Sequence, residues 1–365
     1  MENIKIGIDG HNLEGERTGV GRYLYNLLRE WKSVSAEFFL YFKNKIPEDV
    51  RGFTPHIQAL NAKSNAVFKH WFLPRAAAKD KIDVLFCPDY VLPFRLNRRI
   101  KTALTIHDII YEARPDEYSW PSWKDKILLK WASKHSAKKA DVIFVPSEFT
   151  KSEILKYYKI NPEKIIVTTL APDPIFHRIG REKKRYILFV GSIFNRRFIP
   201  QSIQAFAEFA RDSGDFKFLI IGKNHTKPFQ DIAALVLKAN QALGHKAVIW
   251  REYAGDEGLV RLYSGAFATL WLSSYEGFGL PILESMACGT PVITSRAGSL
   301  PEVAGDAALY IENPQNHEEI ANALSQLARD EIHYNELVQK GTIQAAKFSW
   351  QECARETINN TLKLV

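Results

Sequence analysis

Short apolar runs alternate with glycine-containing loops and amphipathic segments along almost the whole chain, and this alternation constrains the fold most strongly. The run IKIGID at 4–9 is followed by a loop with several glycines and then by the segment 22–31, whose apolar residues have helical spacing. Strands that alternate with helices form a parallel sheet covered by helices. The first half is therefore expected to contain strands at 4–9, 36–42, 83–88, 101–108 and 141–146.

The alternation pauses near residue 170, in the proline-rich and charged stretch LAPDPIFHRIGREKKR, where we expect an interdomain linker. It then restarts, with helices expected in SIQAFAEFARD, DEGLVRLYSGA and PILESMACG and strands at 186–192, 217–222, 246–250, 268–273, 290–295 and 307–311. A chain of 365 residues also exceeds the length at which one core usually stops growing. The sequence predicts an α/β protein with two Rossmann-like, doubly wound domains facing a central cleft, where the carboxyl ends of the strands bind ligand.

Cysteine usage and the apolar pattern indicate a compartment. The three cysteines, Cys87, Cys288 and Cys353, are far apart and form no C-x-x-C pair, which argues against a disulfide framework and against a zinc site. The first residues, MENIKIGIDG, lack the pattern of an export signal, and no window reaches about 18 uninterrupted apolar residues. We therefore expect a cytoplasmic protein.

The net charge of +8 is unevenly distributed along the chain. Residues 1–180 carry 29 Lys and Arg against 21 Asp and Glu, whereas the remainder carries 20 of each. This asymmetry indicates that the first half meets an anionic partner, or that the surplus serves solubility alone.

Gly19 and Gly21 lie where the first loop meets the first expected helix. Missing side chains there allow a phosphate to approach backbone N–H groups at the positive end of a helix. The pattern is neither the G-x-G-x-x-G fingerprint nor a P-loop, and glycines that serve only a tight turn remain the alternative.

His107 follows the expected strand at 101–108, near its carboxyl end. An imidazole at this position would hydrogen-bond a substrate hydroxyl or transfer a proton. A purely structural histidine is the alternative.

The most specific pattern is SSYEGFGLPILESMACGTPVITS at 273–295, in which seven residues separate Glu276 from Glu284. The order of strand, glycine loop and helix, with Pro281 at the helix start, places Glu276 on the loop and Glu284 about one turn into the helix. Carboxylates bind sugar and ribose hydroxyls through charge-assisted hydrogen bonds. Two solvated glutamates that flank a turn are the alternative.

The segment GSIFNRR follows the first expected strand of the second half and contains Ser192, Arg196 and Arg197. Two adjacent guanidinium groups at the carboxyl end of a strand suit a diphosphate. Solvated arginines are the alternative.

Taken together, these residues resemble the retaining GT-B glycosyltransferases of family 4, the group with the E-x7-E motif. The stretch 275–313 carries the closest resemblance, and GVGRYLYNLL, TIHDIIYEARPDEYS, VPSEFTKSEI, LFVGSIFNRR and FSWQECARET are similar to family segments in family order. The resemblance implies an acceptor-side domain at 1–172, a nucleotide-sugar-binding domain at 173–348 and a helix at 349–365 that crosses back to the first domain.

The resemblance also implies roles for individual residues. Glu276 would contact hydroxyls of the donor sugar and Glu284 the nucleotide ribose, while His107 would reach the sugar or the reacting centre. Backbone N–H groups of Phe278, Gly279 and Leu280 would lie beside the donor, the stretch 250–253 beside the base, and the diphosphate would be held by Arg196, Arg197 and the backbone around Gly19 to Gly21. Family members usually have Arg-Lys where this chain has two arginines, and an arginine holds a phosphate bidentately where a lysine acts as a compact point charge.

The resemblance extends to the chemistry and the donor. In the family, the leaving diphosphate takes the acceptor's proton on the same face of the sugar, so the anomeric configuration is retained. No D-x-D triplet occurs, and the arginines suffice to stabilise the leaving group, so we expect neither a metal nor another cofactor. The arginine pair and the segment SLPEVAGDAAL resemble mannosyltransferases of bacterial polysaccharide assembly, which makes GDP-mannose the expected donor.

The expected acceptor is a glycan or a lipid-linked glycan. The segments 68–81 and 120–139 combine basic residues with aromatic ones, and Trp120, Trp123, Leu128 and Trp131 would lie on an anionic membrane surface. Packing of these tryptophans in the core is the alternative. Nucleic acid is not an expected partner, because the second half has no excess positive charge.

Three other functions fit a chain of two Rossmann-like domains. A GT-B sugar-nucleotide epimerase would need no acceptor, but the spacing of the glutamates and the EGFGLP loop favour the transferase. A dinucleotide-dependent oxidoreductase would carry the full glycine fingerprint, which is missing. A non-catalytic nucleotide-sugar-binding protein would not need His107, Glu276 and Glu284 together.

Overall fold

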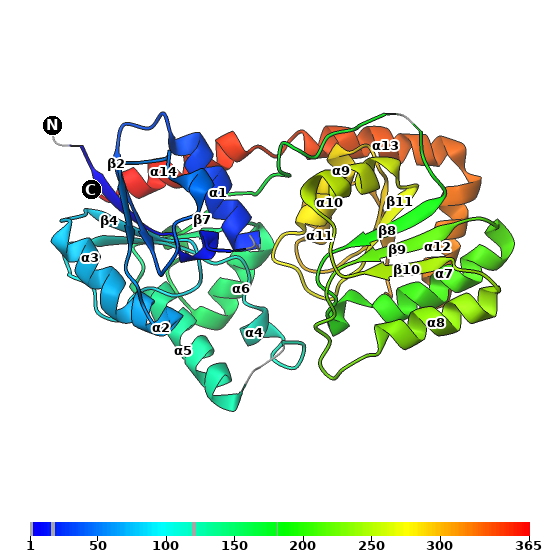
Figure 1. Cartoon of the computed structure of the whole chain (residues 1–365), viewed down its shortest axis with the longest axis horizontal. Helices are drawn as coiled ribbons and strands as arrows, with labels where there is room; N and C mark the ends of the chain where they lie inside the picture. The colour runs from blue at the N-terminus through cyan, green and yellow to red at the C-terminus, as the bar shows by residue number, and fades with distance from the viewer. Residues whose placement is uncertain (1–2, 16–18, 119–121, 181) are drawn as a thin grey trace. The chain divides into compact units, whose positions relative to one another are not determined.

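The computed structural model describes residues 3–15, 19–118, 122–180 and 182–365, and it divides the chain into two compact units. Unit 1 comprises Met1–Ala113, Trp120–Leu170 and Ser349–Val365, and unit 2 comprises Arg114–Ser119 and Ala171–Phe348. Each unit is built on one parallel sheet with helices packed around it (Figure 1). The expectation of an α/β protein with two doubly wound units is confirmed.

The sheet of unit 1 has seven parallel strands in the order β3-β2-β1-β4-β5-β6-β7. The chain starts in the middle at β1, winds outward to β3, and then crosses to the other side of β1 to form β4. The switch point of the sheet therefore lies between β1 and β4. The strands are β1 (Lys5–Asp9), β2 (Glu37–Phe42), β3 (His56–Ala59), β4 (Val84–Cys87), β5 (Lys101–Thr105), β6 (Val142–Val145) and β7 (Ile165–Val167).

The helices of unit 1 include α14 (Trp350–Leu362), the last helix of the chain, which packs against α1 (Gly19–Trp31) near the N-terminus (Figure 1). The indole N–H of Trp31 donates to the carbonyl of Ala354 at 2.9 Å, and this bond is buried. The other helices are α2 (Asn65–Val67), the π-helical turn η3 (Phe68–Phe72), α3 (Leu73–Lys79), α4 (Ile110–Ala113), α5 (Trp123–Lys139) and α6 (Glu148–Tyr158), with 3-10 turns at His11–Leu13, Glu48–Val50 and Pro162–Lys164.

The sheet of unit 2 repeats this winding with six parallel strands in the order β10-β9-β8-β11-β12-β13, so its switch point lies between β8 and β11. The strands are β8 (Tyr186–Val190), β9 (Lys217–Ile221), β10 (Val248–Arg251), β11 (Ala268–Trp271), β12 (Val292–Ser295) and β13 (Ala308–Ile311). The helices are η5 (Asn195–Arg197, 3-10), α7 (Ile199–Ser213), α8 (Ile232–Leu243), α9 (Asp256–Gly265), α10 (Leu280–Ala287), α11 (Leu300–Ala304), α12 (His317–Arg329) and α13 (Glu331–Ala345).

The strands are shorter than the apolar runs that predict them. The run 101–108, for example, contains β5 only to Thr105, so His107 lies in the loop beyond the strand. The two strands that the alternation missed are the two edge strands of the unit 1 sheet: β3 has only half-buried residues, and β7 has three residues. Neither offers an apolar run long enough to signal a strand.

The stretch expected to be a linker packs largely on unit 2. The ring of Phe176 is buried and lies edge-on to Tyr263, with 5.6 Å between the centroids. The ammonium of Lys183 donates to the carbonyl of Ser264 and to the hydroxyl of Thr290. Unit 2 therefore includes this stretch, as part of Ala171–Phe348.

Among the helices in the described ranges, none is both long enough and apolar enough to cross a membrane.

Candidate functional site

The predicted donor-binding residues of unit 2 follow the two strands at its switch point. Ser192, Arg196 and Arg197 come directly after β8, and Glu276 comes five residues after β11. The carboxyl ends of adjacent parallel strands meet at one edge of the sheet, which is where ligands bind in doubly wound folds. The fold thus brings these residues to the edge of the sheet where a ligand would bind.

Arg197 and Glu276 form a buried ion pair at this edge. Nη1 of Arg197 lies 2.5 Å from Oε1 of Glu276, and the two side chains are 8% and 12% exposed. The guanidinium also stacks over the indole of Trp271, with 4.0 Å from Cζ to the ring centroid. The carboxylate and the ring together fix the plane of the guanidinium.

Arg196, the preceding residue of the turn η5, lies farther from the same carboxylate. Its Nε lies 3.9 Å from Oε1 of Glu276, and its guanidinium lies over the ring of Phe194. The backbone carbonyl of Arg196 accepts a hydrogen bond from the N–H of Ser274 at 3.0 Å. The arginine turn and the glutamate loop are therefore tied together by backbone as well as by charge.

The loop from Glu276 to Gly279 is held from behind by the start of α11. The hydroxyl of Ser299 donates to the carbonyls of Glu276 and Phe278 at 3.0 and 2.7 Å. Gly298 has φ +58°, and a Cβ there would lie 2.6 Å from the backbone oxygen of Glu276. Only glycine allows such an approach, so the loop is positioned by backbone contacts that no other residue type would permit.

Helix α10 begins immediately after this loop. Gly279 is its N-cap residue, with φ +113° and no side-chain cap, and Leu280 and Pro281 form the first turn. An N-terminus without a side-chain cap presents its first N–H groups and the positive end of the helix dipole to an anion. As the sequence predicted, Glu276 lies on the loop and Glu284 in the second turn of α10.

Glu284 is 8% exposed and accepts a hydrogen bond at 3.0 Å from the hydroxyl of Tyr263, on the neighbouring helix α9. Its carboxylate is therefore held by a different element from the one that holds Glu276. The structure brings Arg196, Arg197 and Glu276 into contact, and it places Glu284 beside Tyr263.

The loop after β8 passes close to β9 and β11. A Cβ on Gly222 would lie 1.9 Å from the carbonyl oxygen of Gly191, and one on Gly191 would lie 2.7 Å from the Trp271 ring. Ser192 follows this crossing. The stretch predicted to lie beside the base ends β10: the indole N–H of Trp250 donates to the carbonyl of Gly222, and Tyr253 is largely exposed.

His107 belongs to unit 1 and follows β5. Its Nε2 lies 3.0 Å from the carbonyl oxygen of Pro88, which only accepts, so Nε2 carries the proton. Burial lowers the pKa of the imidazole to about 4, so the ring is neutral at physiological pH and its Nδ1 is a hydrogen-bond acceptor. The edge-on ring of Tyr23, with 4.9 Å between centroids, fixes its orientation.

Gly19 and Gly21 are the first and third residues of α1. A Cβ on Gly19 would meet nothing within 4 Å, and neither glycine has a positive φ, so a strained turn does not account for them. Their predicted contact with a phosphate stays a prediction.

The alternative of core packing is wrong for two of the three tryptophans on the basic segment. Trp123 and Trp131 are both exposed on α5, as are Ile127 and Leu128. Trp120 lies outside the described residues. Within the described ranges, no group of three or more His, Cys, Asp or Glu side chains is arranged to hold a metal ion.

Four residues of the donor-side site were not singled out from the sequence: Trp271, Tyr263, Gly298 and Ser299. The first two appear in the sequence as ordinary apolar positions of a strand and a helix. Gly298 and Ser299 fall inside the stretch that carries the family resemblance, but contacts with a loop more than 20 residues earlier leave no local pattern.

Both halves of the chain match models of known families. Residues 17–170 match the model described as Glycosyltransferase Family 4, and residues 174–344 match the model described as Glycosyl transferases group 1. The two matches meet close to the boundary between unit 1 and unit 2.

Individual relatives agree with these matches. The chain is 30% identical over 300 residues to the O-antigen chain mannosyltransferase B of Escherichia coli, which covers 78% of this chain and 75% of that protein. It is 29% identical over 262 residues to the O-antigen chain mannosyltransferase RfbU of Salmonella typhimurium, which covers 72% and 69%. Among solved structures, Anabaena Alr3699/HepE in complex with UDP-glucose superimposes with a TM-score of 0.76, at 13% identity and over 100% of both chains.

Two doubly wound α/β units with these family matches define a glycosyltransferase of the GT-B fold class. More particularly, the chain belongs to glycosyltransferase family 4. The resemblance seen in the sequence is thereby confirmed, whereas the roles of the individual site residues remain predictions.

We expect Gly298→Ala to destabilise the protein more than Gly244→Ala does. Both glycines have positive φ, at +58° and +75°, so both substitutions carry a conformational cost of about 1 kcal/mol. At Gly298 the new Cβ also meets the backbone of Glu276, whereas at Gly244 nothing lies within 4 Å. The extra loss, about 1–3 kcal/mol, is measured as a difference in free energy of unfolding in urea. Equal losses would contradict the tight packing of the loop.

We expect His107→Gln to reduce the loss of stability on acidification. The folded state lowers the pKa of His107 from 6.5 to about 4. Between these values the unfolded chain binds a proton that the folded chain does not, so the free energy of unfolding decreases as the pH falls, by up to about 1.4 kcal/mol per pH unit. Urea denaturation of both proteins at about pH 7 and about pH 5 measures the difference. Parallel pH profiles would show that His107 titrates normally.

Proposed function

We propose that the protein transfers mannose from GDP-mannose to a hydroxyl of a glycan or lipid-linked acceptor, with retention at the anomeric carbon, in the assembly of cell-surface polysaccharide or lipopolysaccharide. The two named relatives, both O-antigen chain mannosyltransferases, support the sugar and the biological setting. The Anabaena structure, in complex with UDP-glucose, supports a nucleotide-sugar donor.

The observation that carries this proposal is the group of two guanidiniums and one carboxylate at the switch point of unit 2. Arg196, Arg197 and Glu276 carry a net charge of +1, and the N-terminus of α10, which no side chain caps, follows the same loop. This combination suits a ligand that is a polyol at one end and a diphosphate at the other. Guanidinium forks hold phosphate oxygens, and a carboxylate accepts hydrogen bonds from sugar hydroxyls.

Arg197 is able to bind Glu276 and a phosphate together, because a guanidinium has five N–H donors in a planar fork. Its stacking on Trp271 keeps that plane fixed, so little rearrangement is needed when the donor binds. We assign Glu276 to the hydroxyls of the transferred sugar and Glu284 to the ribose. Phe278, Gly279 and Leu280 contribute backbone N–H groups, and Ser192 lies at the start of the diphosphate loop.

In the proposed reaction the leaving diphosphate oxygen accepts the proton of the acceptor hydroxyl on the face where the new bond forms. The transition state resembles an oxocarbenium ion, and Arg196 and Arg197 stabilise the charge that develops on the diphosphate. The arginines take the place that a divalent metal has in other transferases, so no metal is required. We assign the neutral ring of His107 a hydrogen bond to the transferred sugar, with Nδ1 as acceptor.

We expect the purified protein to release GDP from GDP-mannose, but not UDP from UDP-glucose or UDP-N-acetylglucosamine, and to do so in the presence of EDTA. Release should increase with a membrane lipid extract that supplies the acceptor. Glu276→Gln should lower kcat/KM by at least about tenfold, because a charge-assisted hydrogen bond contributes about 1.5–3 kcal/mol. NMR of the product reports whether the anomeric configuration is retained.

Glu312→Gln is the matched control for this variant. Glu312 also pairs with an arginine of unit 2, Arg296, at 2.6 Å, but the pair is exposed, and Glu312 follows β13 at the sheet edge. Its kcat/KM should stay at the wild-type value. Loss of activity in EDTA would contradict the metal-free mechanism, and release from a UDP-sugar alone would contradict the donor.

We further propose that unit 1 docks on the inner face of an anionic membrane, next to a lipid-linked acceptor. Exposed apolar side chains gather on α2, η3 and α5, and we call them the unit 1 apolar patch. Trp131 on α5 and His70 on η3 are linked through the ring of Phe94, with centroid distances of 5.1 and 3.8 Å. The patch consists of Val67, Trp71 and Phe72 from α2 and η3 and of Trp123, Ile127, Leu128 and Trp131 from α5.

Basic residues surround the unit 1 apolar patch. The guanidinium of Arg75 lies over the ring of Trp71 at 3.9 Å, Lys63 lies near the start of α2, and Lys138 and Lys139 end α5. Exposed aromatic residues beside cations are typical of proteins that lie in the interface of an anionic bilayer. The surplus of positive charge in the first half of the chain then has a partner.

We expect replacement of Trp123 and Ile127 by Ala to weaken binding to phosphatidylglycerol-containing vesicles at least about tenfold. Burial of each apolar side chain in the interface contributes about 1.5–3 kcal/mol to the free energy of binding. Co-sedimentation at low and high salt measures this. Replacing the equally exposed Phe229 and Ile332 of unit 2 by Ala is the control. The membrane proposal would be wrong if the affinity for vesicles changed neither with salt concentration nor with the α5 substitutions.

A further inference from the structure

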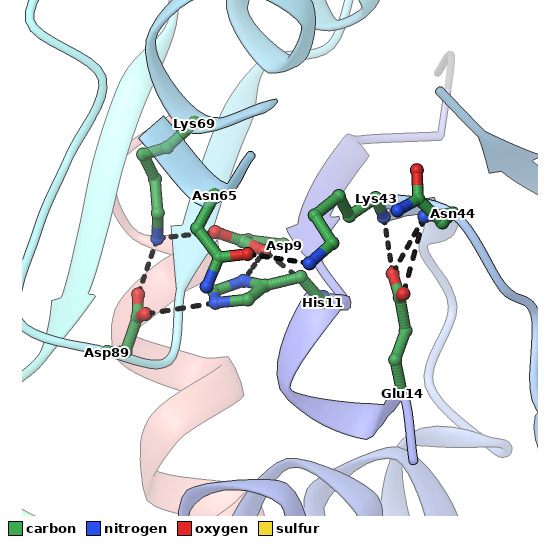
Figure 2. A network of polar contacts seen from close by, with 8 residues as sticks. All are labelled: Asp9, His11, Glu14, Lys43, Asn44, Asn65, Lys69 and Asp89. Atoms are coloured by element: carbon green, nitrogen blue, oxygen red, sulfur yellow. Dashed lines mark hydrogen bonds and ion pairs between the residues drawn. The ribbon is translucent and has the colours of Figure 1, made fainter. Parts of the chain in front are cut away.

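A buried network of charged side chains lies at the switch point of unit 1, and the proposed function does not yet use it. Asp9 is the last residue of β1, His11 follows it, and Asp89 follows β4, so both strands at the reversal contribute (Figure 2). Lys69 reaches the network from the π-helical turn η3. The position in unit 1 is equivalent to that of Arg197 and Glu276 in unit 2.

The contacts within the network are short and specific. Nζ of Lys69 lies 2.5 Å from Oδ2 of Asp9 and 2.5 Å from Oδ1 of Asp89. Nδ1 of His11 lies 2.6 Å from Oδ1 of Asp9. Asp9 is fully buried and the Lys69 side chain is 7% exposed, whereas the side chains of His11 and Asp89 are 11% and 19% exposed. Asp89 and His11 are therefore the members that a ligand is able to touch.

In its fully ionised form the network is neutral overall. Burial alone would raise the pKa of Asp9, but attraction to Lys69 and His11 outweighs burial and holds it below its usual value. Burial alone would lower the pKa of His11, but the carboxylates of Asp9 and Asp89 raise it. With Lys69 and His11 protonated, two positive charges balance two negative ones. A neutral network does not attract a phosphate, so the ligand it suits is an uncharged polyol.

The geometry between Asp89 and His11 fits one hydroxyl group. Nε2 of His11 lies 3.6 Å from Oδ2 of Asp89, which is too long for a direct hydrogen bond. A hydroxyl whose oxygen lies within hydrogen-bond distance of both atoms would donate to Oδ2 and accept from the N–H of Nε2 of a protonated His11. The neighbouring Asn12 also has a buried Nδ2 atom that has no hydrogen-bond partner in the described part of the chain, so a further donor is present in the same turn.

Stability alone is a weak reason for such a network. Buried ion pairs rarely stabilise a protein more than apolar side chains of the same size, because removing charges from water is costly. Ionisable clusters with perturbed pKa values are instead typical of functional sites, and π-helical turns are often found at such sites.

We propose that Asp89 and His11 bind a hydroxyl of the acceptor sugar at the switch point of unit 1, and that Asp9 and Lys69 are positioning residues that fix them. This inference rests on the proposed function, because it names the acceptor side of the same transfer. It assigns recognition of a neutral glycoside to the network and leaves attraction to the membrane to the exposed basic residues.

The test uses methyl α-mannoside and its monodeoxy derivatives as soluble acceptors and follows GDP release from GDP-mannose by the full chain. Asp89→Asn should raise the KM for methyl α-mannoside at least about tenfold, because it removes a charge-assisted hydrogen bond. The dissociation constant for GDP-mannose should stay within about twofold, since Asp89 is not among the residues assigned to the donor. For one of the deoxy mannosides, the KM of the wild-type protein should be raised by the same factor, and Asp89→Asn should not raise that KM further.

Two further variants complete the test. Glu37→Gln is the matched control, because Glu37 also contacts a lysine and a histidine, at 3.9 and 2.8 Å, but lies at the amino end of β2. His11→Gln should raise the same KM with little change in kcat, and it decides the outcome if Asp89→Asn does not fold.

The possible results are distinguishable. The inference would be overturned if Asp89→Asn and His11→Gln showed the same KM for methyl α-mannoside as Glu37→Gln. It would also be overturned if methyl α-mannoside failed to stimulate the turnover of GDP-mannose by the wild-type protein. Failure of the wild-type protein to bind or turn over GDP-mannose would instead contradict the proposed function.

Discussion

Parallel strand pairing at two switch points is the constraint on which the functional side chains of this protein depend. Because β8 pairs with β9 on one side and β11 on the other, the loops that follow β8 and β11 leave the sheet at the same edge. The guanidinium of Arg197 and the carboxylate of Glu276 thereby meet, although nearly 80 residues separate them in the chain. The same winding in unit 1 brings Asp9 to Asp89 through the ammonium of Lys69.

The two networks differ in charge, and this difference fits the different ligands that we propose for the two units. The network of unit 2 has two cations for one anion and is followed by the N-terminus of α10, so it favours a ligand with negative charge. The network of unit 1 in its fully ionised form has equal numbers of each, so hydrogen-bond geometry would decide which ligand it accepts. A nucleoside diphosphate sugar fits the first description and a glycan hydroxyl the second.

The sequence predicted more of the fold than of the contacts. The alternation of apolar runs identified eleven of the strands, because buried parallel strands are continuous apolar segments, and it missed β3 and β7 because their residues are few or half-buried. The E-x7-E spacing placed Glu276 and Glu284 correctly on the loop and the helix, since that relation is local. The pairing of Glu276 with Arg197, the stack on Trp271 and the bond from Tyr263 to Glu284 depend on three-dimensional packing, which local patterns do not encode.

The buried network of unit 1 is a second feature that local sequence patterns did not predict. Asp9, His11, Lys69 and Asp89 are unremarkable in the sequence, and the excess of basic residues in the first half suggested an anionic partner for that half as a whole. In the folded chain Lys69 is buried between two carboxylates, whereas Lys63, Lys138 and Lys139 remain on the surface near the unit 1 apolar patch. Only the surface cations contribute to attraction at a distance, because the charge of Lys69 is neutralised within the protein. In the proposed function, net charge therefore bears on how unit 1 would meet a membrane, whereas its choice among neutral acceptors would depend on a site whose charges cancel.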